Sequence, residues 1–204
     1  MRAWVGPSMD GPVLGLSMLP VLTELPATPM AAPAAGWIQL ADLGSLDRTL
    51  LRAWRLSRAL PNQLEVRYTE LLATLSATER EATVRQRIGQ DLFRDGLLTL
   101  WRGRCAISGL NVPELLRASH AKPWAASADT KRLDVYTGLL LAAHLDATFD
   151  SGLIAGEADG SVAISSTLSV DAISVLGLDL FSKVILSASH LRYLAWHRAV
   201  VFRP

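Results

Sequence analysis

The chain has a single cysteine, Cys105, among its 204 residues. One thiol excludes an intramolecular disulfide and any zinc site built on paired cysteines. The sequence also lacks a run of about 18 apolar residues, the length at which a membrane-spanning helix becomes a candidate. These two absences suit a reducing compartment, so we expect a cytoplasmic protein without a membrane partner. We interpret Cys105 as a small buried residue.

The charge balance is nearly neutral, with a formal net charge of +1 at pH 7, and by itself gives little sign of a nucleic-acid partner. Its distribution is more informative. Residues 1–47 have a net charge of −3, residues 48–104 carry eleven arginines against six acids, and residues 105–204 have a net charge of −1. Arginine's planar fork suits phosphate better than lysine does. The middle third is therefore either a phosphate-binding surface or a solvated, arginine-rich helix face.

The first 42 residues are rich in proline and alanine and show no sustained periodicity. This composition predicts a poorly ordered lead-in. An apolar stretch here ends in alanines, as a secretory signal does, but it is interrupted by Pro20, Glu24, Pro26 and Pro29. We therefore favour a flexible or mistranslated leader over a secretory signal.

Residues 43–104 are expected to form a helical arm. The first helix begins near Leu43, with Ser45 or Asp47 as its N-cap. Pro61 ends it, because proline lacks the amide hydrogen that continues a helix. Residues at helical spacing predict an apolar stripe made of Leu46, Leu50, Ala53 and Trp54.

Two further helices follow in this arm. The stretch "QLEVRYTELLATLS" predicts the second, and "SATEREATVRQRIGQDLFRDGLLTLWRG" predicts the third. Ser76 or Thr78 would cap the third helix. Its predicted apolar face consists of Val84, Ile88, Leu92 and Leu98.

From residue 104 onward the pattern changes to short β-like segments. Strands are predicted at "RCAISGL" and at residues 116–119, and "TGLLLAAHLDATFDSG" indicates a strand or loop that runs into a helix closed by Gly152. A hairpin turns through Asp159 and Gly160, and a final helix follows near the end of the chain. The expected fold class is α+β, with a core at residues 105–170 and a C-terminal helical segment at 171–204.

Two carboxylates in the predicted helix are the first sign of chemistry. Asp146 and Asp150 are four residues apart, so they point the same way from a helix. Like charges so placed repel unless a cation, strong donors or solvent compensates them. A hard divalent ion with oxygen ligands is one solution, and a wet surface is the other. This helix begins "LLLAAHL" and has Phe149 between the acids, which is too apolar for a wholly exposed element.

The ordered string "RCAISGL…LLRASHAKPW…RLDVYTGLLLAAHLDATFDSGLI" resembles the HNH endonuclease superfamily, the ββα-metal nucleases. It is most similar to a branch found in bacterial proteins described as restriction endonucleases. The flanking "TEREATVRQRIGQDLFRDGLLTLWRGRC" and "HLRYLAWHR" resemble the same group, so the resemblance covers roughly residues 48–203.

The resemblance implies a role for each matching position. The general base that activates water falls on His120, and the preceding position, a metal ligand in many relatives, is Ser119. The middle asparagine of the motif, which orients the loop of the base, falls on Thr137, a departure from the pattern. The last motif position falls on Asp146, and a further ligand position falls on Asp150.

The implied activity is metal-assisted hydrolysis of DNA phosphodiester bonds, in restriction or defence. Asp146 and Asp150 would hold one divalent ion, with Mg²⁺ expected before Mn²⁺. Internal ion pairs with Glu79, Glu81 or Asp91 are the alternative to DNA contact for the arginines. The residues expected to contact DNA phosphates are Arg85, Arg87, Arg94, Arg104 and Lys122.

The other histidines and the aromatic residue after the motif have less specific interpretations. His144 lies about 200° around the helix from Asp146. It is expected to lie behind the groups that would hold the metal ion, or to be a structural residue. His190 and His197, in the tail helix, are expected to be ordinary structural residues. Trp124 is expected to pack, with Pro123 fixing the turn before it.

Thr137 leaves a second function open. One hydroxyl replaces an amide that both donates and accepts, and the loss of one loop-fixing bond would cost about 1–3 kcal/mol. The alternative is therefore a catalytically weakened HNH-fold protein that binds DNA or regulates. Cutting both strands would need a homodimer or two encounters, since one site of this kind breaks one bond.

Overall fold

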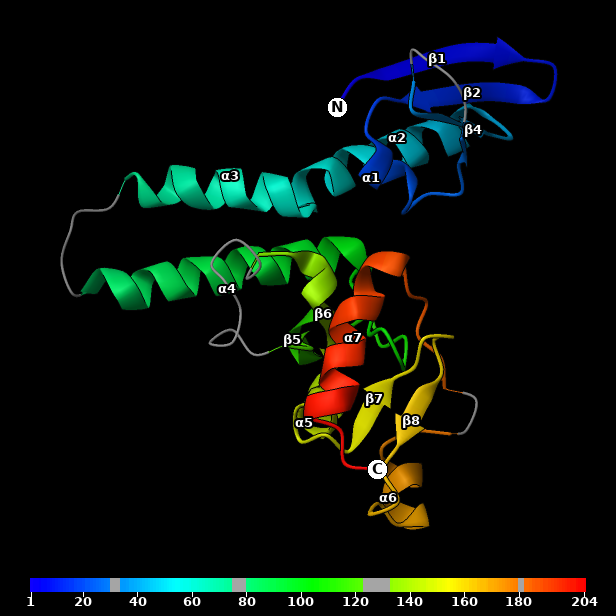
Figure 1. Ribbon diagram of the computed structural model, residues 1–204. Helices are drawn as coiled ribbons and strands as arrows, with labels where there is room; N and C mark the ends of the chain where they lie inside the picture. The colour runs from blue at the N-terminus through cyan, green and yellow to red at the C-terminus, as the bar shows by residue number, and fades with distance from the viewer. Residues whose placement is uncertain (30–33, 75–79, 123–132, 180–181) are drawn as a thin grey trace. The chain divides into compact units, whose positions relative to one another are not determined.

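The computed structural model in Figure 1 describes residues 1–29, 34–74, 80–122, 133–179 and 182–204. The chain forms two compact units, Met1–Gln63 and Leu64–Pro204. This division differs from the predicted boundaries after residues 42 and 104, because the first long helix groups with the residues before it. The predicted α+β class is confirmed: helices and small antiparallel sheets make up the described residues.

The first unit contains a sheet where a poorly ordered lead-in was predicted. Its strands are β1 (Ala3–Ser8), β2 (Gly11–Leu16), β3 (Thr28–Pro29) and β4 (Gly36–Gln39), in the antiparallel order β1-β2-β4-β3. Helix α1 (Leu19–Leu22) follows β2. Two of the prolines in this segment, Pro7 on the edge strand β1 and Pro12 near the start of β2, lie where a missing amide donor is tolerated. The sheet buries Leu14, Leu16 and Ile38.

Helix α2 (Leu43–Ala59) starts as predicted but with a different cap. Its N-cap is Asp42, whose Oδ1 accepts a 2.6 Å hydrogen bond from the Ser45 amide, so Ser45 and Asp47 do not cap it. The buried face is made of Ala53, Leu56 and Ala59. Trp54 was predicted on that face, but it is 51% exposed and lies beneath the Arg58 guanidinium.

Helix α3 (Pro61–Leu72) spans the boundary between the two units, and helix α4 (Arg80–Leu100) lies in the second unit. Helix α3 starts at Pro61, directly after the end of α2, as the proline predicted. Helix α4 buries a face that is shifted from the predicted one towards its C-terminal half, and Val84 is exposed. The predicted caps Ser76 and Thr78 lie outside the described residues. The buried residues of α4 include Leu92, Phe93, Leu97 and Leu100.

Two antiparallel strands and a short helix form the centre of the second unit. Strand β5 (Leu116–His120) pairs with β6 (Gly138–Ala142), and His120 lies opposite Gly138. Helix α5 (Ala143–Asp150) follows β6 without a loop and packs on both strands. Strand β5 was predicted, and so was the segment that runs from a strand or loop into helix α5. Gly152 was predicted to close this helix, and its φ of +72° lets the chain leave it.

The predicted strand at "RCAISGL" is wrong, because this segment folds into turns. Arg102, Gly103 and Gly109 all have positive φ, so the chain bends too sharply to extend. Cys105 is buried, as expected, and its Sγ accepts a 3.3 Å hydrogen bond from the Ala142 amide. The Ala106 amide donates to the carbonyl of Leu140, which fixes the turn against β6.

The predicted hairpin and tail helix are confirmed. Strands β7 (Ile154–Gly156) and β8 (Val162–Ile164) pair antiparallel, and helix α6 (Val170–Val175) follows. Helix α7 (Ala188–Val200), drawn in red in Figure 1, packs on β7 and contacts the short 3₁₀ helix η4 (Val135–Thr137) before β6. Among the described residues, no helix has both the length and the apolar character needed to cross a membrane.

Candidate active site

A cavity of about 440 Å³ opens beside strand β5 and helix α5. Strand β5 and the residue after it contribute residues 117–121, and helix α5 contributes Asp146 and Asp150. The last turn of helix α7 and the residue after it form the remaining wall. The lining residues are Arg117, Ala118, Ser119, His120, Ala121, Asp146, Asp150, His197 and Val201.

The two carboxylates of α5 enter this cavity together. Leu145 and Phe149 are buried against the strands, so the helical period turns Asp146 and Asp150 to one side of the helix. Burial raises the pKa of both carboxyls, and the Asp146 charge raises the pKa of Asp150 further. Asp150 also ends the helix, where the macrodipole disfavours a negative charge. A cation in the cavity would relieve all of these effects.

Ser119 is the hydrogen-bond donor to this pair. It is buried, and its Oγ donates to Oδ1 of Asp150 over 3.3 Å. The hydroxyl lowers the pKa of both Asp146 and Asp150, in opposition to the effect of burial. Because a hydroxyl can also offer an oxygen lone pair, the position can support an ion without being a strong ligand itself.

Arg117 is a site residue that the sequence reasoning missed. It lines the cavity, and its positive charge lowers the pKa of Asp146. Its guanidinium is held by the carbonyls of Glu114 and Leu116, each at 3.0 Å from Nη1. Strand alternation could have found it, because residues 117 and 119 share one face of β5.

His120 ends strand β5 and lines the same cavity as the carboxylates. Its ring stacks on Phe93 of α4, with centroids 3.8 Å apart and an interplanar angle of 14°. Gly138, its partner in β6, is required here, since an added Cβ would collide with the Ser119 carbonyl and lie 2.6 Å from the Phe93 ring. The position of the histidine ring therefore depends on a close approach that only glycine permits.

Thr137 is buried, and its side chain makes a hydrogen bond within its own turn. Its Oγ1 donates to the carbonyl of Asp134 over 2.8 Å, which closes η4 on itself. Its carbonyl oxygen accepts the Ala121 amide over 2.7 Å. The backbone at position 137 thus holds the residue that follows His120, although the motif asparagine is absent.

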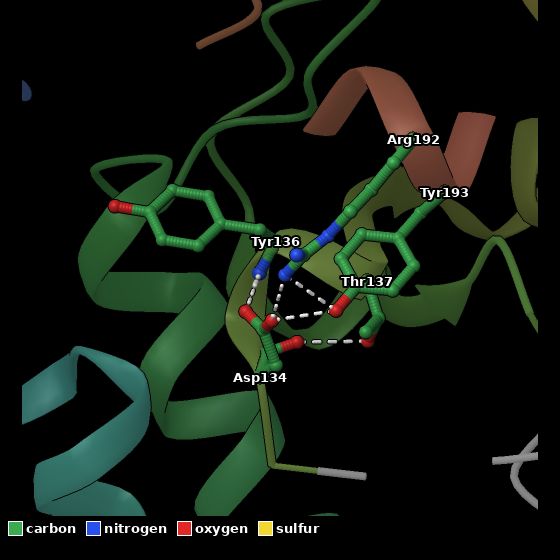
Figure 2. Close-up of polar contacts among 5 residues, drawn as sticks. All are labelled: Asp134, Tyr136, Thr137, Arg192 and Tyr193. Atoms are coloured by element: carbon green, nitrogen blue, oxygen red, sulfur yellow. Dashed lines mark hydrogen bonds and ion pairs between the residues drawn. The ribbon is translucent and has the colours of Figure 1, made fainter. Parts of the chain in front are cut away.

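A buried carboxylate anchors this turn, and the sequence analysis gave it no role. Asp134 Oδ1 accepts the Tyr136 amide over 3.0 Å. Its Oδ2 accepts the Tyr193 hydroxyl over 2.7 Å and the Arg192 guanidinium over 3.1 Å, both from α7. Figure 2 shows these contacts converging on Asp134, with Thr137 beside them. An acid flanked by apolar residues gave no sequence signal of its distant partners.

Two predicted site residues lie away from the cavity wall. His144 is exposed, and it is not among the residues that line the cavity. Lys122, two residues after the base position, places its Nζ 5.5 Å from the centre of the Trp196 ring. Trp124 and Pro123 lie outside the described residues.

The predicted phosphate-binding arginines divide into two groups. Arg94 donates 2.7 Å hydrogen bonds to the carbonyls of Leu116 and Pro113, so it fastens α4 to the start of β5. Arg104 donates to the carbonyl of Gly109 within its own turn. Arg85 and Arg87 lie on an exposed part of α4, as does Asp91, one of the alternative partners. Glu79 lies outside the described residues, as does the side chain of Glu81.

The two tail-helix histidines, both predicted to be structural, differ in their surroundings. His190 completes a capping box with Ser187, and burial lowers its pKa to about 4. His197 lines the cavity. Its Nε2–H donates to the carbonyl of Phe149 over 3.1 Å, and its ring stacks on Phe149 at 3.7 Å. Burial lowers the pKa of His197, which keeps the ring neutral.

The donor set fits a hard divalent ion that keeps most of its own ligands. Two carboxylates and a hydroxyl share one cavity, and all are oxygen donors. In the part of the chain that the structure describes, no three histidine, cysteine, aspartate or glutamate side chains are placed to enclose a metal. Mg²⁺ suits such a site, because it is commonly held by one or two carboxylates, with water and phosphate oxygens completing the octahedron.

A comparison with models of protein families matches one segment of the chain to a known family. Residues 105–155 match the family model described as HNH endonuclease. The matched segment runs from Cys105 through β5, β6 and α5 into β7, so it contains most of the cavity wall. It does not include α7, and therefore not His197. No curated protein matches the chain.

Proposed function

We propose that this chain, whose residues 105–155 match the HNH endonuclease family model, hydrolyses DNA phosphodiester bonds at the cavity beside β5 and α5. The observation that supports this most strongly is the shared cavity itself. A histidine, a hydroxyl and two carboxylates whose pKa values are raised all line it. Raised carboxyl pKa values in a cleft are typical of functional sites, because stability alone would disfavour them.

His120 is the general base in this proposal. It would take a proton from the attacking water as that water approaches the phosphorus, a role for which imidazole is the commonest side chain. Phe93 fixes the plane of the ring by stacking. The Thr137 carbonyl fixes the backbone after it through the Ala121 amide.

Asp146 and Asp150 would hold a divalent ion, with Mg²⁺ the first choice and Mn²⁺ the second. The ion would stabilise negative charge on the scissile phosphate and on the leaving oxygen. Ser119 keeps Asp150 oriented by its hydrogen bond, and Arg117 adds positive charge beside Asp146. Arg117, Arg85 and Arg87 would bind flanking phosphates.

A plasmid assay tests this function. Supercoiled DNA is incubated with the purified chain in Mg²⁺, in Mn²⁺ and in EDTA, with Asp146→Asn as the site variant. The proposal predicts nicking by the native chain in either metal, none in EDTA, and a loss of at least about a hundredfold in the variant. Nicking that persists in EDTA would refute the assigned site.

The second candidate is a DNA-binding or regulatory protein on the same scaffold. One observation favours it: among the described residues, the hydrogen bond of the Thr137 side chain stays within its own turn, although the resemblance places the loop-orienting asparagine at this position. Salt-sensitive DNA binding without cleavage in either metal would identify this function. Double-strand cutting with a rate that depends on the square of the protein concentration would indicate that two copies act together.

A further inference from the structure

Helix α7 lies outside the segment that matches the family, yet it contacts both halves of the site. We propose that Tyr193 and His197 are positioning residues that align the His120 loop with the carboxylate helix. The proposal rests on the proposed function and extends it to a part of the chain that the motif does not include. Two buried hydrogen bonds that start from one face of α7 support it.

Tyr193 and His197 are four residues apart in α7, so their side chains lie on the same face of the helix. Both are buried, at 7% and 2% exposure. A single rigid element therefore presents two polar groups towards the core. Any movement of α7 would shift both contacts together.

The first contact connects α7 to the residue that follows His120. The Tyr193 hydroxyl donates to Oδ2 of Asp134 over 2.7 Å, and Asp134 holds the turn η4 through the Tyr136 amide. That turn ends at Thr137, whose carbonyl accepts the Ala121 amide, one residue after His120. Figure 2 shows the first part of this chain of contacts.

The Tyr193 hydroxyl stays protonated over the pH range in which nuclease activity would be measured. Burial, together with the Asp134 carboxylate, raises the pKa of Tyr193 to about 12. The hydroxyl is therefore protonated and able to donate wherever the enzyme would work. Arg192 adds a second donor to the same carboxylate oxygen, but its side chain is 66% exposed. We therefore assign to Tyr193 the larger part of the interaction that holds Asp134 in place.

The second contact leads to the carboxylates. The His197 ring stacks on Phe149 with an interplanar angle of 5°, and its Nε2–H donates to the Phe149 carbonyl. Phe149 lies between Asp146 and Asp150 in α5. His197 thus fixes the height and rotation of the helix turn that carries both acids, while its own ring forms part of the cavity wall.

The two contacts together account for how this chain can do without the motif asparagine. In place of an amide at position 137 that reaches across the loop, the turn is closed by the Thr137 hydroxyl and secured from outside by α7. Removing the Tyr193 donor should therefore disturb the loop after His120. Removing the His197 donor should disturb the helix that carries the two carboxylates.

Two matched variants test this, since each keeps an aromatic ring and removes the polar group that makes the contact. In Tyr193→Phe we expect kcat for plasmid nicking to fall about tenfold, with KM and the Kd for Mn²⁺ within about twofold of the native chain. In His197→Phe we expect the Kd for Mn²⁺ to rise about fivefold or more, with nicking largely recovered at saturating Mn²⁺. Calorimetric titration with Mn²⁺ alone gives the affinities.

Leu194→Val is the control. Leu194 is also buried on α7 and lies near Gly156, and it has no polar group that could make either hydrogen bond. It should lower the unfolding temperature and leave kcat and the Kd for Mn²⁺ unchanged. If it changes these constants as much as the two test variants do, α7 has a general packing role only, and the proposal is overturned.

An activity-independent measurement separates this proposal from the proposed function. Tyr193→Phe should speed hydrogen exchange at the Ala121 amide, measured by NMR, because the Thr137 carbonyl that holds this amide becomes less fixed. If the native chain cuts no DNA but these exchange and Mn²⁺ changes occur, the alignment holds and only the nuclease function fails. Unchanged Ala121 exchange together with unchanged Mn²⁺ affinity would overturn the alignment.

Discussion

The Ser119 hydroxyl donates a 3.3 Å hydrogen bond to Oδ1 of Asp150, and so joins strand β5 to helix α5 within the cavity. Burial raises the pKa of Asp146 and Asp150, and this hydroxyl partly offsets that effect. The Ser119 hydroxyl thus lowers the pKa of the two carboxylates. In the proposed site, their protonation state would control whether a cation can bind.

Ser119→Ala should move the acid limb of the pH–rate profile to higher pH. Without the hydroxyl, the pKa of both carboxyls rises further, so protons compete with the metal ion at a higher pH. The shift is measured from the nicking rate between pH 5 and pH 8 at fixed Mg²⁺. Ser119→Thr, which keeps the hydroxyl, is the matched control and should retain the native acid limb. An unchanged limb in the alanine variant would show that the hydroxyl does not act on these acids.

Asp150→Asn should stabilise the fold when metal is absent. A carboxyl whose folded pKa is raised favours the protonated state, so its contribution to stability is present at low pH and is lost as pH rises through the folded pKa. At pH 7 in EDTA, a neutral asparagine removes repulsion from Asp146 and the unfavourable charge at the end of α5. We expect the unfolding temperature to rise by about 1–2 °C, since the side chain is exposed and screened.

Added Mg²⁺ should reverse this order, because the native chain binds the ion in its folded state and the variant binds it weakly. At one hundred times the Kd the native chain would gain about 2.7 kcal/mol. A variant that is less stable than the native chain in EDTA would contradict the account of two repelling acids.

Gly138→Ala should lower both stability and activity. The added Cβ would collide with the Ser119 carbonyl and with the Phe93 ring that supports His120. Overpacking of this kind costs about 1–3 kcal/mol. Gly6→Ala is the control, because nothing lies within 4 Å of a Cβ at that position. Denaturant unfolding measures both, and equal stability of the two variants would contradict the close approach.

Arg117→Ala and Arg94→Ala should separate DNA contact from structure. Arg117 lies at the cavity, so its loss should reduce the salt dependence of DNA affinity by about one phosphate contact. Arg94 does not line the cavity, and both Nη1 and Nη2 of its guanidinium donate to backbone carbonyls, so its loss should lower the unfolding temperature and leave the salt slope unchanged. Fluorescence anisotropy at several salt concentrations measures the slopes, and an unchanged slope in Arg117→Ala would remove this residue from the DNA interface.

Local sequence signals predicted much of the chain from Pro61 onward. Pro61 ended one helix and began the next, Gly152 followed α5, and the spacing of Asp146 and Asp150 placed them on one face. These features depend on a few neighbouring residues and on helical geometry. The β7–β8 hairpin was predicted for the same reason, since alternation and a turn are visible in a short window.

Features that depend on distant contacts were missed. The sheet in residues 1–42 forms because short strands bury Leu14, Leu16 and Ile38 together, which overrides the proline content. Asp134 meets Tyr193 across 59 positions, and His197 meets Phe149 across 48. No local pattern encodes such pairs, so the role of α7 emerged only from the structure.

The central claim is that His120 activates water for phosphodiester hydrolysis at this cavity. The most direct measurement is the nicking rate of His120→Ala on supercoiled plasmid in Mg²⁺, with and without added imidazole. We predict a loss of at least about a hundredfold, with unchanged Mn²⁺ affinity, and partial recovery as imidazole supplies the missing base. A variant that nicks at the native rate would contradict the claim.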